Sequence, residues 1–194
     1  MIPSHLLQAH LHHGGCLLGA FSETQLVGLI YGFAGPANGN YLLSHLAAVH
    51  PRWQGQGLGQ RLKLAQAEWA RQRGFQRILW TFDPMRPANA RLNIAKLGAV
   101  CRHYHEDYYG PLDDDLNRGI PTDRLEIEWW LSPIQRRPQT FIAFPRCIPQ
   151  HSRLEWRLRL RNEFQRAFAD GLWVVNFEIV DDEARYWIGE VLAD

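Results

Sequence analysis

The chain has 194 residues, of which 46% are hydrophobic, 12% aromatic and 21% charged. This composition fits one globular domain, or one domain with an appendage, and excludes disordered, collagen-like and small disulfide-stabilised proteins. Lys and Arg number 21 against 20 Asp and Glu, a net charge of +1, so charge gives no support to a nucleic-acid partner. The chain lacks an apolar run of roughly 18 residues, the length of a membrane span, and begins without the features of a signal peptide. We expect a cytoplasmic protein with no membrane partner.

The first 50 residues are expected to form one helix and three strands. Ser4 is a candidate N-cap for the helix, which Gly14 would end. Two apolar, β-rich runs follow, and the three turn-like residues between them indicate a hairpin. A turn cluster precedes the third strand. The expected ranges are 4–13 for the helix and 16–21, 25–33 and 41–49 for the strands.

The middle of the chain alternates helices and strands. After a glycine-rich loop, Leu58, Leu62, Ala65 and Trp69 recur at steps of four, three and four residues, which predicts one apolar face of a helix that ends at Gly74. This alternation favours a mixed α/β sheet. The remaining elements expected here are a helix at 88–97 and strands at 76–82, 99–109 and 124–131.

The composition changes after residue 131. The next 18 residues contain four prolines and no acidic residue, which indicates a linker around one short strand at 140–144. The last 45 residues read as a small appendage with a basic helix at 152–170 and strands at 172–180 and 183–192. The expected division is a main domain at 1–131, a proline-rich linker at 132–149 and an appendage at 150–194.

The loop at residues 54–59 carries the most informative pattern. It reads QGQGLG, with three glycines at alternate positions between a strand and a helix. Such a loop can turn its N–H groups inward beside the positive end of the helix dipole, which suits a pyrophosphate. The spacing is not the G-x-G-x-x-G of dinucleotide-binding folds, and no Gly-Lys-Ser/Thr follows as in a P-loop. By itself the pattern also fits a plain tight turn into a helix.

This segment resembles the Q/R-x-x-G-x-G/A pyrophosphate loop of the GNAT superfamily of acyl-CoA-dependent N-acyltransferases, and the strand before it ends AVHP, as is familiar there. Residues 89–98, NARLNIAKLG, are similar to that superfamily's asparagine-led helix ending K-L-G. The resemblance covers about residues 5–131 and extends to a poorly characterised GNAT group with a C-terminal extension. It implies a mixed α/β (α+β) fold: a GNAT-like central mixed sheet flanked by helices, N-terminally shortened, with a small C-terminal α/β appendage.

The resemblance also implies an N-acyltransferase that uses acetyl-CoA or another acyl-CoA as co-substrate, with no metal. By this resemblance, the pantetheine arm would pair with backbone groups of Ala47, Ala48 and Val49, and its thiol end would be contacted by Asn89. The pyrophosphate would be held by the amides of Gln54, Gly55, Gln56, Gly57, Leu58 and Gly59.

Acyl transfer to an amine needs a base for the amine and a proton for the departing thiolate. His45 is the titratable member of the strand face 43, 45, 47 and 49, and its ordinary pKa of about 6.5 suits a general base. A packed strand histidine fits equally well. The tyrosine that the family commonly places two residues before the lysine of K-x-G is Ile94 here, so the acid is another group, with Tyr104 as the candidate, or solvent.

The acidic loop before residue 124 is the candidate acceptor site, because loops between late GNAT strands border the amine. Asp113, Asp114 and Asp115 form either a solvated loop or a site for a cationic amine, with Arg118 or Arg124 binding a carboxylate. Both charges together suit a small amino-acid-like amine. The alternatives are transfer to a protein N-terminus or lysine, and a non-catalytic acyl-CoA-binding module.

Two further expectations concern cysteines and assembly. Cys16, Cys101 and Cys147 are an odd number at wide spacings, which indicates small apolar residues in the core instead of disulfides or a zinc site. Histidines 103 and 105 share a strand face, but two ligands do not make a metal site. The aromatic appendage is too small to fold alone, so we expect it to cover the edge left by the absent first GNAT strand and helix, in the same subunit or in a partner. We also expect a homodimer.

Overall fold

The computed structural model describes residues 3–36, 39–112 and 119–192. The chain divides into two compact units, residues 1–80 with 130–132 and residues 81–129 with 133–194. In both, strands form a sheet with helices against it, a mixed α/β architecture that confirms the expected fold class. None of the described helices is long and apolar enough to cross a membrane.

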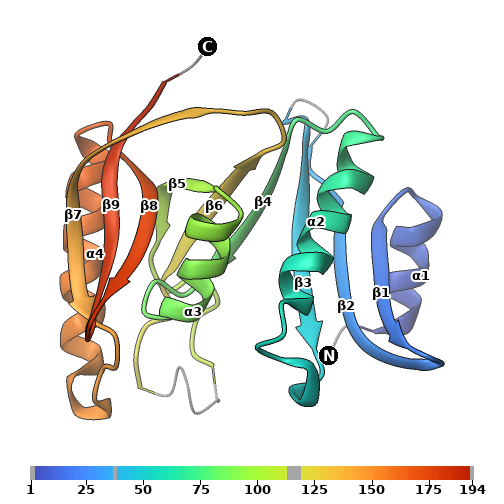
Figure 1. The fold of residues 1–194 in the computed structure, drawn as a ribbon, viewed down its shortest axis with the longest axis horizontal. Coiled ribbons are helices and arrows are strands. Elements are labelled where there is room, and N and C mark those ends of the chain that lie inside the picture. Colours follow the sequence, from blue (N-terminus) through green and yellow to red (C-terminus); the bar gives the residue numbers. More distant parts are fainter. Residues whose placement is uncertain (1–2, 37–38, 113–118, 193–194) are drawn as a thin grey trace. The chain divides into compact units, whose positions relative to one another are not determined.

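The first unit is built on strands in the order β1-β2-β3-β4 (Figure 1). The first three run antiparallel to one another, and β3 and β4 are parallel. Helix α2 packs on β1, β2 and β3, while α1 lies against β1. The bounds are α1 (Ser4–His12), β1 (Cys16–Ser22), β2 (Gln25–Ala34), β3 (Tyr41–Val49), a short 3₁₀ turn η1 (Pro51–Trp53), α2 (Leu58–Arg71) and β4 (Arg77–Phe82).

These elements confirm the ranges expected for the N-terminal half, with two corrections. Ser4 does not cap α1, because Pro3 occupies the N-cap position and no side chain bonds the first turn. The buried face of α2 is also not the predicted one, since Ala65 is exposed and Trp69 is only partly buried. The helix instead turns toward the sheet a stripe that includes two polar residues: Leu58, Leu62, Lys63, Gln66, Ala67 and Ala70.

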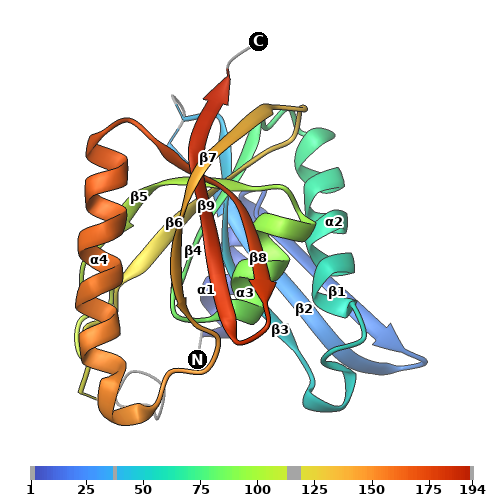
Figure 2. The ribbon, with the colours of Figure 1, turned by 60° about the vertical axis from the view of Figure 1, so that its left-hand side comes forward.

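The second unit contains strands in the order β6-β5-β8-β9-β7, each antiparallel to its neighbour. Helix α4 runs along this sheet and packs on β5 and β7 (Figure 2). The bounds are α3 (Pro87–Ala90), the π-helical turn η2 (Arg91–Lys96), β5 (Val100–His105), β6 (Arg124–Trp130), β7 (Gln135–Pro145), the 3₁₀ turn η3 (Gln150–Ser152), α4 (Arg153–Ala169), β8 (Trp173–Val180) and β9 (Glu183–Leu192).

Three elements of the second unit differ from expectation. The single helix at 88–97 is a short α-helix continued by a π-helical turn. Strand β5 ends at His105, four residues before the expected end at 109. Asp107 has a φ of +43°, a left-handed conformation that is incompatible with a β-strand. Strand β7 is more than the short strand expected at 140–144: it pairs with β9 from Gln135, and a bulge between Pro138 and Thr140 accommodates the proline, which has no N–H to donate.

The C-terminal segment was expected to cover an N-terminal edge, in the same subunit or in a partner; within the chain its strands pair elsewhere, and docking on a partner stays a prediction. Strand β8 pairs with β5 through Cys101 and Val174, so the segment extends the sheet of its own unit. Its Tyr186 is fully buried against Phe144, Phe164 and Phe177. The tyrosine hydroxyl donates a hydrogen bond of 2.8 Å to the carbonyl of Pro84.

The prediction of three buried cysteines is confirmed in part: Cys16 and Cys101 are buried, whereas Cys147 is exposed.

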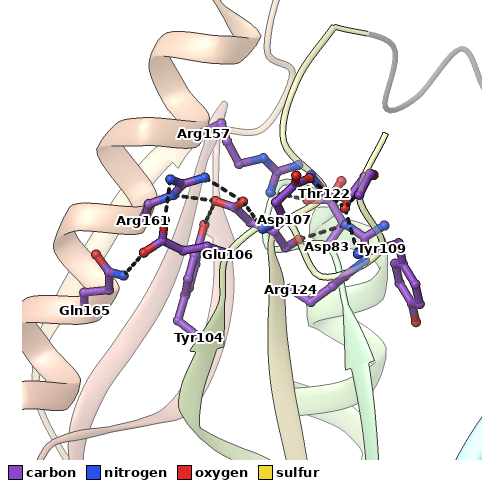
Figure 3. A network of polar contacts seen from close by, with 12 residues as sticks. Asp83, Tyr104, Glu106, Asp107, Tyr109, Thr122, Arg124, Arg157, Arg161 and Gln165 are labelled. Atoms are coloured by element: carbon purple, nitrogen blue, oxygen red, sulfur yellow. Dashed lines mark hydrogen bonds and ion pairs between the residues drawn. The ribbon is translucent and has the colours of Figure 1, made fainter. Parts of the chain in front are cut away.

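A buried ion network joins α4 to the β5–β6 region (Figure 3). Both carboxylate oxygens of Asp123, which is fully buried, accept hydrogen bonds from Arg161, at 2.9 and 2.8 Å. Tyr104 donates to the same carboxylate at 2.7 Å, and the backbone N–H of Asp107 donates at 3.0 Å. Burial alone would raise the pKa of Asp123, but these donors outweigh it and lower the pKa below its ordinary value.

We expect Arg161→Met to lower the free energy of unfolding by about 3–5 kcal/mol, because it leaves the Asp123 carboxylate buried without its cation. The matched control is Arg159→Met on the same helix, whose partner Glu163 lies 2.8 Å away with the two side chains 56% and 34% exposed. That loss should be at most about 1 kcal/mol. Urea unfolding at pH 7 measures both, and equal losses would contradict the role of the network.

The same pair predicts the acid response. A carboxylate with a lowered folded-state pKa contributes stability that is complete above the ordinary Asp pKa of about 3.9 and is lost as pH falls through the folded-state pKa. The difference between wild type and Arg161→Met should therefore shrink below about pH 4.

Candidate functional site

Strand β3 leaves β4 after three paired residues. Tyr41, Leu42 and Leu43 pair with β4, and within the described chain this parallel pairing stops there. On its other edge β3 stays paired with β2 as far as Val49. One edge of β3 therefore carries N–H and C=O groups, from Ser44 to the strand end, that an extended ligand with amide groups could bind as an added strand.

A β-bulge lies at the beginning of this open edge. The register between β2 and β3 shifts after Tyr31↔Leu46 to Gly32↔Ser44, which leaves His45 as the extra residue. The bulge interrupts the strict alternation that predicts one shared face for residues 43, 45, 47 and 49. Residues 45–48 are all exposed, so His45 is accessible where a bulge can aim it.

His45 adjoins an aromatic cluster. Its ring centroid lies 6.1 Å from that of Tyr31, edge-on, and 6.0 Å from that of Phe33. His10 of α1 stacks on Tyr31, and the His10 Nδ1 atom hydrogen-bonds the tyrosine hydroxyl. The cluster gives His45 a largely apolar flank on one side and solvent on the other.

The loop after β3 is fixed by side chains that bond its own backbone. Gln54 donates from Nε2 to the carbonyl of Val49 at 3.0 Å, and Gln56 donates to the carbonyl of Arg52 at 2.9 Å. Val49 and Trp53 pack on a hydrophobic cluster that includes Leu58. The loop is thereby attached to the sheet at both ends while Gly55 and Gly57 stay exposed.

Two glycines of this loop adopt conformations that other residues avoid. Gly55 has a φ of +74° and Gly57 a φ of +80°, and a Cβ at either position would meet no atom within 4 Å. Gly57 is the N-cap of α2 and brings no side chain to the first turn. The N–H groups of that turn have no partner within the helix and the space in front of the loop is open, as an anion requires.

A buried amine lies where β3 and β4 separate. Lys63 of α2 is 5% exposed, and its Nζ donates to Ser44 Oγ at 2.9 Å. The Nζ atom also lies 3.4 Å from the ring centroid of Trp80. Burial lowers the pKa of Lys63 to about 7, because the apolar surroundings disfavour its charged form. An amine that titrates near neutral pH can exchange protons in a reaction.

The second unit holds the remaining predicted residues. Asn89 is exposed on α3. Arg124 is 8% exposed and donates to the Asp123 carbonyl at 2.8 Å, with its guanidinium 5.1 Å from the Tyr109 ring. The Tyr104 hydroxyl donates a hydrogen bond to the Asp123 carboxylate, and burial raises the tyrosine pKa well above its usual range. Residues 113–115 and Arg118 lie outside the described residues.

The structure thus brings together His45, the open edge of β3 and the loop at 54–59 in one unit. Sequence reasoning missed Lys63, Tyr31 and Trp80 as neighbours of this site. The sequence contains one feature that could have drawn attention to Lys63. Only two of the 21 basic residues are lysines, and Lys63 directly follows Leu62, a predicted core position. No group of three or more His, Cys, Asp or Glu side chains in the described part of the chain could hold a metal ion.

Comparison with known proteins gives the family. The family model for the acetyltransferase (GNAT) family matches residues 2–98, half of the chain. The search of curated protein sequences found no significant match.

Solved structures with the same fold include an IAA acetyltransferase from Bacillus cereus (TM-score 0.55, 16% identity, 66% of this chain and 85% of that chain). An acetyltransferase from Bacillus subtilis in complex with CoA gives a TM-score of 0.55 at 18% identity over 66% and 83%. The ribosomal-protein-S18-alanine N-acetyltransferase from Escherichia coli gives 0.55 at 14% identity over 72% and 83%. At identities this low, the solved structures show a shared fold. The family match, which spans half of the sequence, shows that the chain belongs to the GNAT acetyltransferase family.

Proposed function

We propose that this chain is an acyl-CoA-dependent N-acyltransferase that transfers an acetyl group to a small, amino-acid-like amine. One observation carries the proposal: the open edge of β3 leads directly into a glycine loop with positive φ angles and an uncapped helix start. An extended amide chain ending in a pyrophosphate has the chemistry that these two features bind in succession. Acyl-CoA is such a molecule, and its thioester supplies the group transferred.

The proposed binding mode assigns a role to each predicted cofactor residue. Backbone groups of Ala47, Ala48 and Val49 pair with the pantetheine arm. The amides of residues 54–59 hold the pyrophosphate, and Asn89 contacts the arm near its thiol end. Support comes from the exposure of residues 47 and 48 and from the open space before Gly55 and Gly57, which a phosphate oxygen can enter.

In the proposed reaction His45 removes the proton of the attacking amine, directly or through one water. A backbone N–H near Ala48 or Val49 donates to the oxyanion that forms at the thioester carbonyl. The bulge position and exposure of His45 support this role, because an arriving amine can reach the imidazole from solvent.

The acceptor has two candidate classes. For a small amino-acid-like amine, Arg118 and Arg124 would bind the carboxylate. Transfer to a protein N-terminus is the second candidate, and the fold shared with the S18-alanine enzyme supports it. Measuring release of the CoA thiol from acetyl-CoA with panels of amines, amino acids and peptides decides between them. Absence of release with every acceptor, together with retained CoA binding, would favour a non-catalytic acyl-CoA-binding module.

Location and assembly belong to the same proposal. A cytoplasmic protein has access to acyl-CoA. A homodimer is supported by two apolar side chains that a second subunit could cover. Phe21 and Leu26 are paired across the β1–β2 hairpin and are 65% and 46% exposed. Light scattering at several concentrations tests the dimer.

Replacing Gly57 with Leu should weaken CoA binding at least tenfold, because a side chain would occupy the open space before the loop. The matched control is Gly74→Leu, at the far end of α2: Gly74 has a φ of +77° and also has no atom within 4 Å of a Cβ. Both variants pay a similar cost for a left-handed residue, about 1–2 kcal/mol. Calorimetry with CoA measures the affinities, and equal affinities in the two variants would remove the phosphate assignment.

Replacing His45 with Ala should lower kcat by about 10²–10⁴, the range typical for loss of a general base. CoA affinity should change little, since the imidazole lies against Tyr31 and Phe33 and is not part of the loop at 54–59 that would hold the pyrophosphate. His103→Ala, another exposed strand histidine, is the control. Steady-state rates across pH 5–10 provide the measurement. A His45→Ala enzyme with a wild-type rate and pH profile would show that the residue only packs against its aromatic neighbours.

A further inference from the structure

The point at which β3 and β4 separate is lined by three side chains from three elements. Leu43 and Leu79 form the last pair of the two strands. The next residue on each strand is Ser44 and Trp80, and Lys63 of α2 contacts both. We call Lys63, Ser44 and Trp80 the fork cluster. It closes the inner end of the gap between the strands.

The fork cluster holds an amine where a charge is costly. The Nζ atom of Lys63 faces the Ser44 hydroxyl and the Trp80 ring instead of a carboxylate. Desolvation is the cause of its lowered pKa of about 7. A methionine or leucine at this helix position would fill the site without that cost, so packing alone does not explain the amine.

In the proposed binding mode, the fork cluster lies beside the sulfur atom of CoA, the leaving group of the reaction. In the proposed binding mode the pantetheine arm starts at the loop at 54–59 and follows β3 backward from Val49. Pairing with β4 closes the gap at Leu43, so an arm lying in the gap ends beside Ser44. The sulfur of the thioester is at that end of the arm.

We propose that Lys63, acting through the hydroxyl of Ser44, supplies the proton taken up by the departing CoA thiolate. This inference rests on the proposed function. The amine nitrogen bonds to the acyl carbon, and the carbonyl electron pair moves to oxygen to give the oxyanion. When the carbonyl re-forms, the carbon–sulfur bond breaks and the electron pair of that bond goes to sulfur. The thiolate takes a proton from Ser44 Oγ, which takes one from the Lys63 ammonium. His45 passes the amine proton to solvent, and solvent returns a proton to Lys63.

Acid strength favours Lys63 over the other candidates. A thiol has a pKa of about 8.5 and an ordinary lysine about 10.4, so an ordinary lysine is a weaker acid than the thiol it would have to protonate. Lys63, at about 7, is a stronger acid than the thiol. Ile94 carries no proton to give. Tyr104 donates its hydroxyl hydrogen to Asp123, and burial raises its pKa, which makes it a poor donor.

The first test measures the titration directly. The sequence contains two lysines, Lys63 and Lys96, and Lys96 is exposed, so lysine labelled with ¹³C at Cε gives two signals in NMR spectra. Lys63→Met and Lys96→Met assign them. The Lys63 signal should titrate near pH 7, well below the ordinary range of a lysine. Two signals that both titrate above pH 9 would overturn the proposal.

The second test measures turnover. Because the protonated amine is the donor, we expect the wild-type kcat to fall as pH rises through the Lys63 pKa. Lys63→Met should lower kcat by about 10²–10⁴ and remove this alkaline fall. Ser44→Ala should reduce kcat in the same direction. CoA affinity by calorimetry should stay within about threefold of wild type, and the thermal midpoint of Lys63→Met should not fall, because the variant removes a buried amine. Lys96→Met and Tyr104→Phe should retain the alkaline fall.

The outcomes separate this inference from the function on which it rests. If wild type binds acetyl-CoA and releases thiol but Lys63→Met keeps the wild-type kcat and alkaline fall, the inference fails and the proposed function stands. A Lys63→Met enzyme that loses CoA affinity or stability but keeps the alkaline fall would assign Lys63 a structural role and also overturn it. If wild type does not bind acetyl-CoA at all, the proposed function fails and the inference fails with it.

Discussion

The separation of β3 from β4 after three residue pairs is the constraint on which the proposed chemistry depends. A sheet satisfies its backbone groups by pairing neighbouring strands, so a strand edge left open in the middle of a sheet needs another partner. Here the open edge continues into a loop whose glycines and helix start favour an anion. The bulge at His45 and the amine of Lys63 lie near the closed end of the same gap. The proposed binding edge, the proposed base and the proposed acid are therefore all positioned by one departure from regular pairing.

The second unit is organised by a different interaction, the burial of a carboxylate with its arginine. Asp123 receives donors from α4, from Tyr104 and from the turn after β5. It thereby ties the C-terminal helix to the strand pair β5–β6. The residues that sequence reasoning assigned to the acceptor and acid roles, Arg124 and Tyr104, both bond Asp123 through its carbonyl or carboxylate. These hydrogen bonds to Asp123 fix the side-chain positions of Arg124 and Tyr104.

Local patterns explain why much of the fold could be predicted. The strand at 41–49 and the loop before α2 follow from β-rich runs, turn residues and glycine spacing, which act over a few neighbouring residues. Other features depend on distant parts of the chain. The bulge at His45 arises from register with β2, and the length of β7 from pairing with β9 across a proline. The burial of Lys63 contradicts the usual exposure of lysine, and only its neighbours Ser44 and Trp80 reveal it.

The polar stripe that α2 turns toward its sheet has a consequence for the evolution and engineering of this protein. At a core position occupied by an amine, an apolar residue of similar volume is expected to be neutral or stabilising, so selection for thermal tolerance alone would favour its replacement. Persistence of lysine there would then report selection for turnover against stability. On the proposed role of Lys63, the identity of this one helix position in a set of natural relatives would distinguish chains that catalyse transfer from chains that have kept the scaffold for binding only.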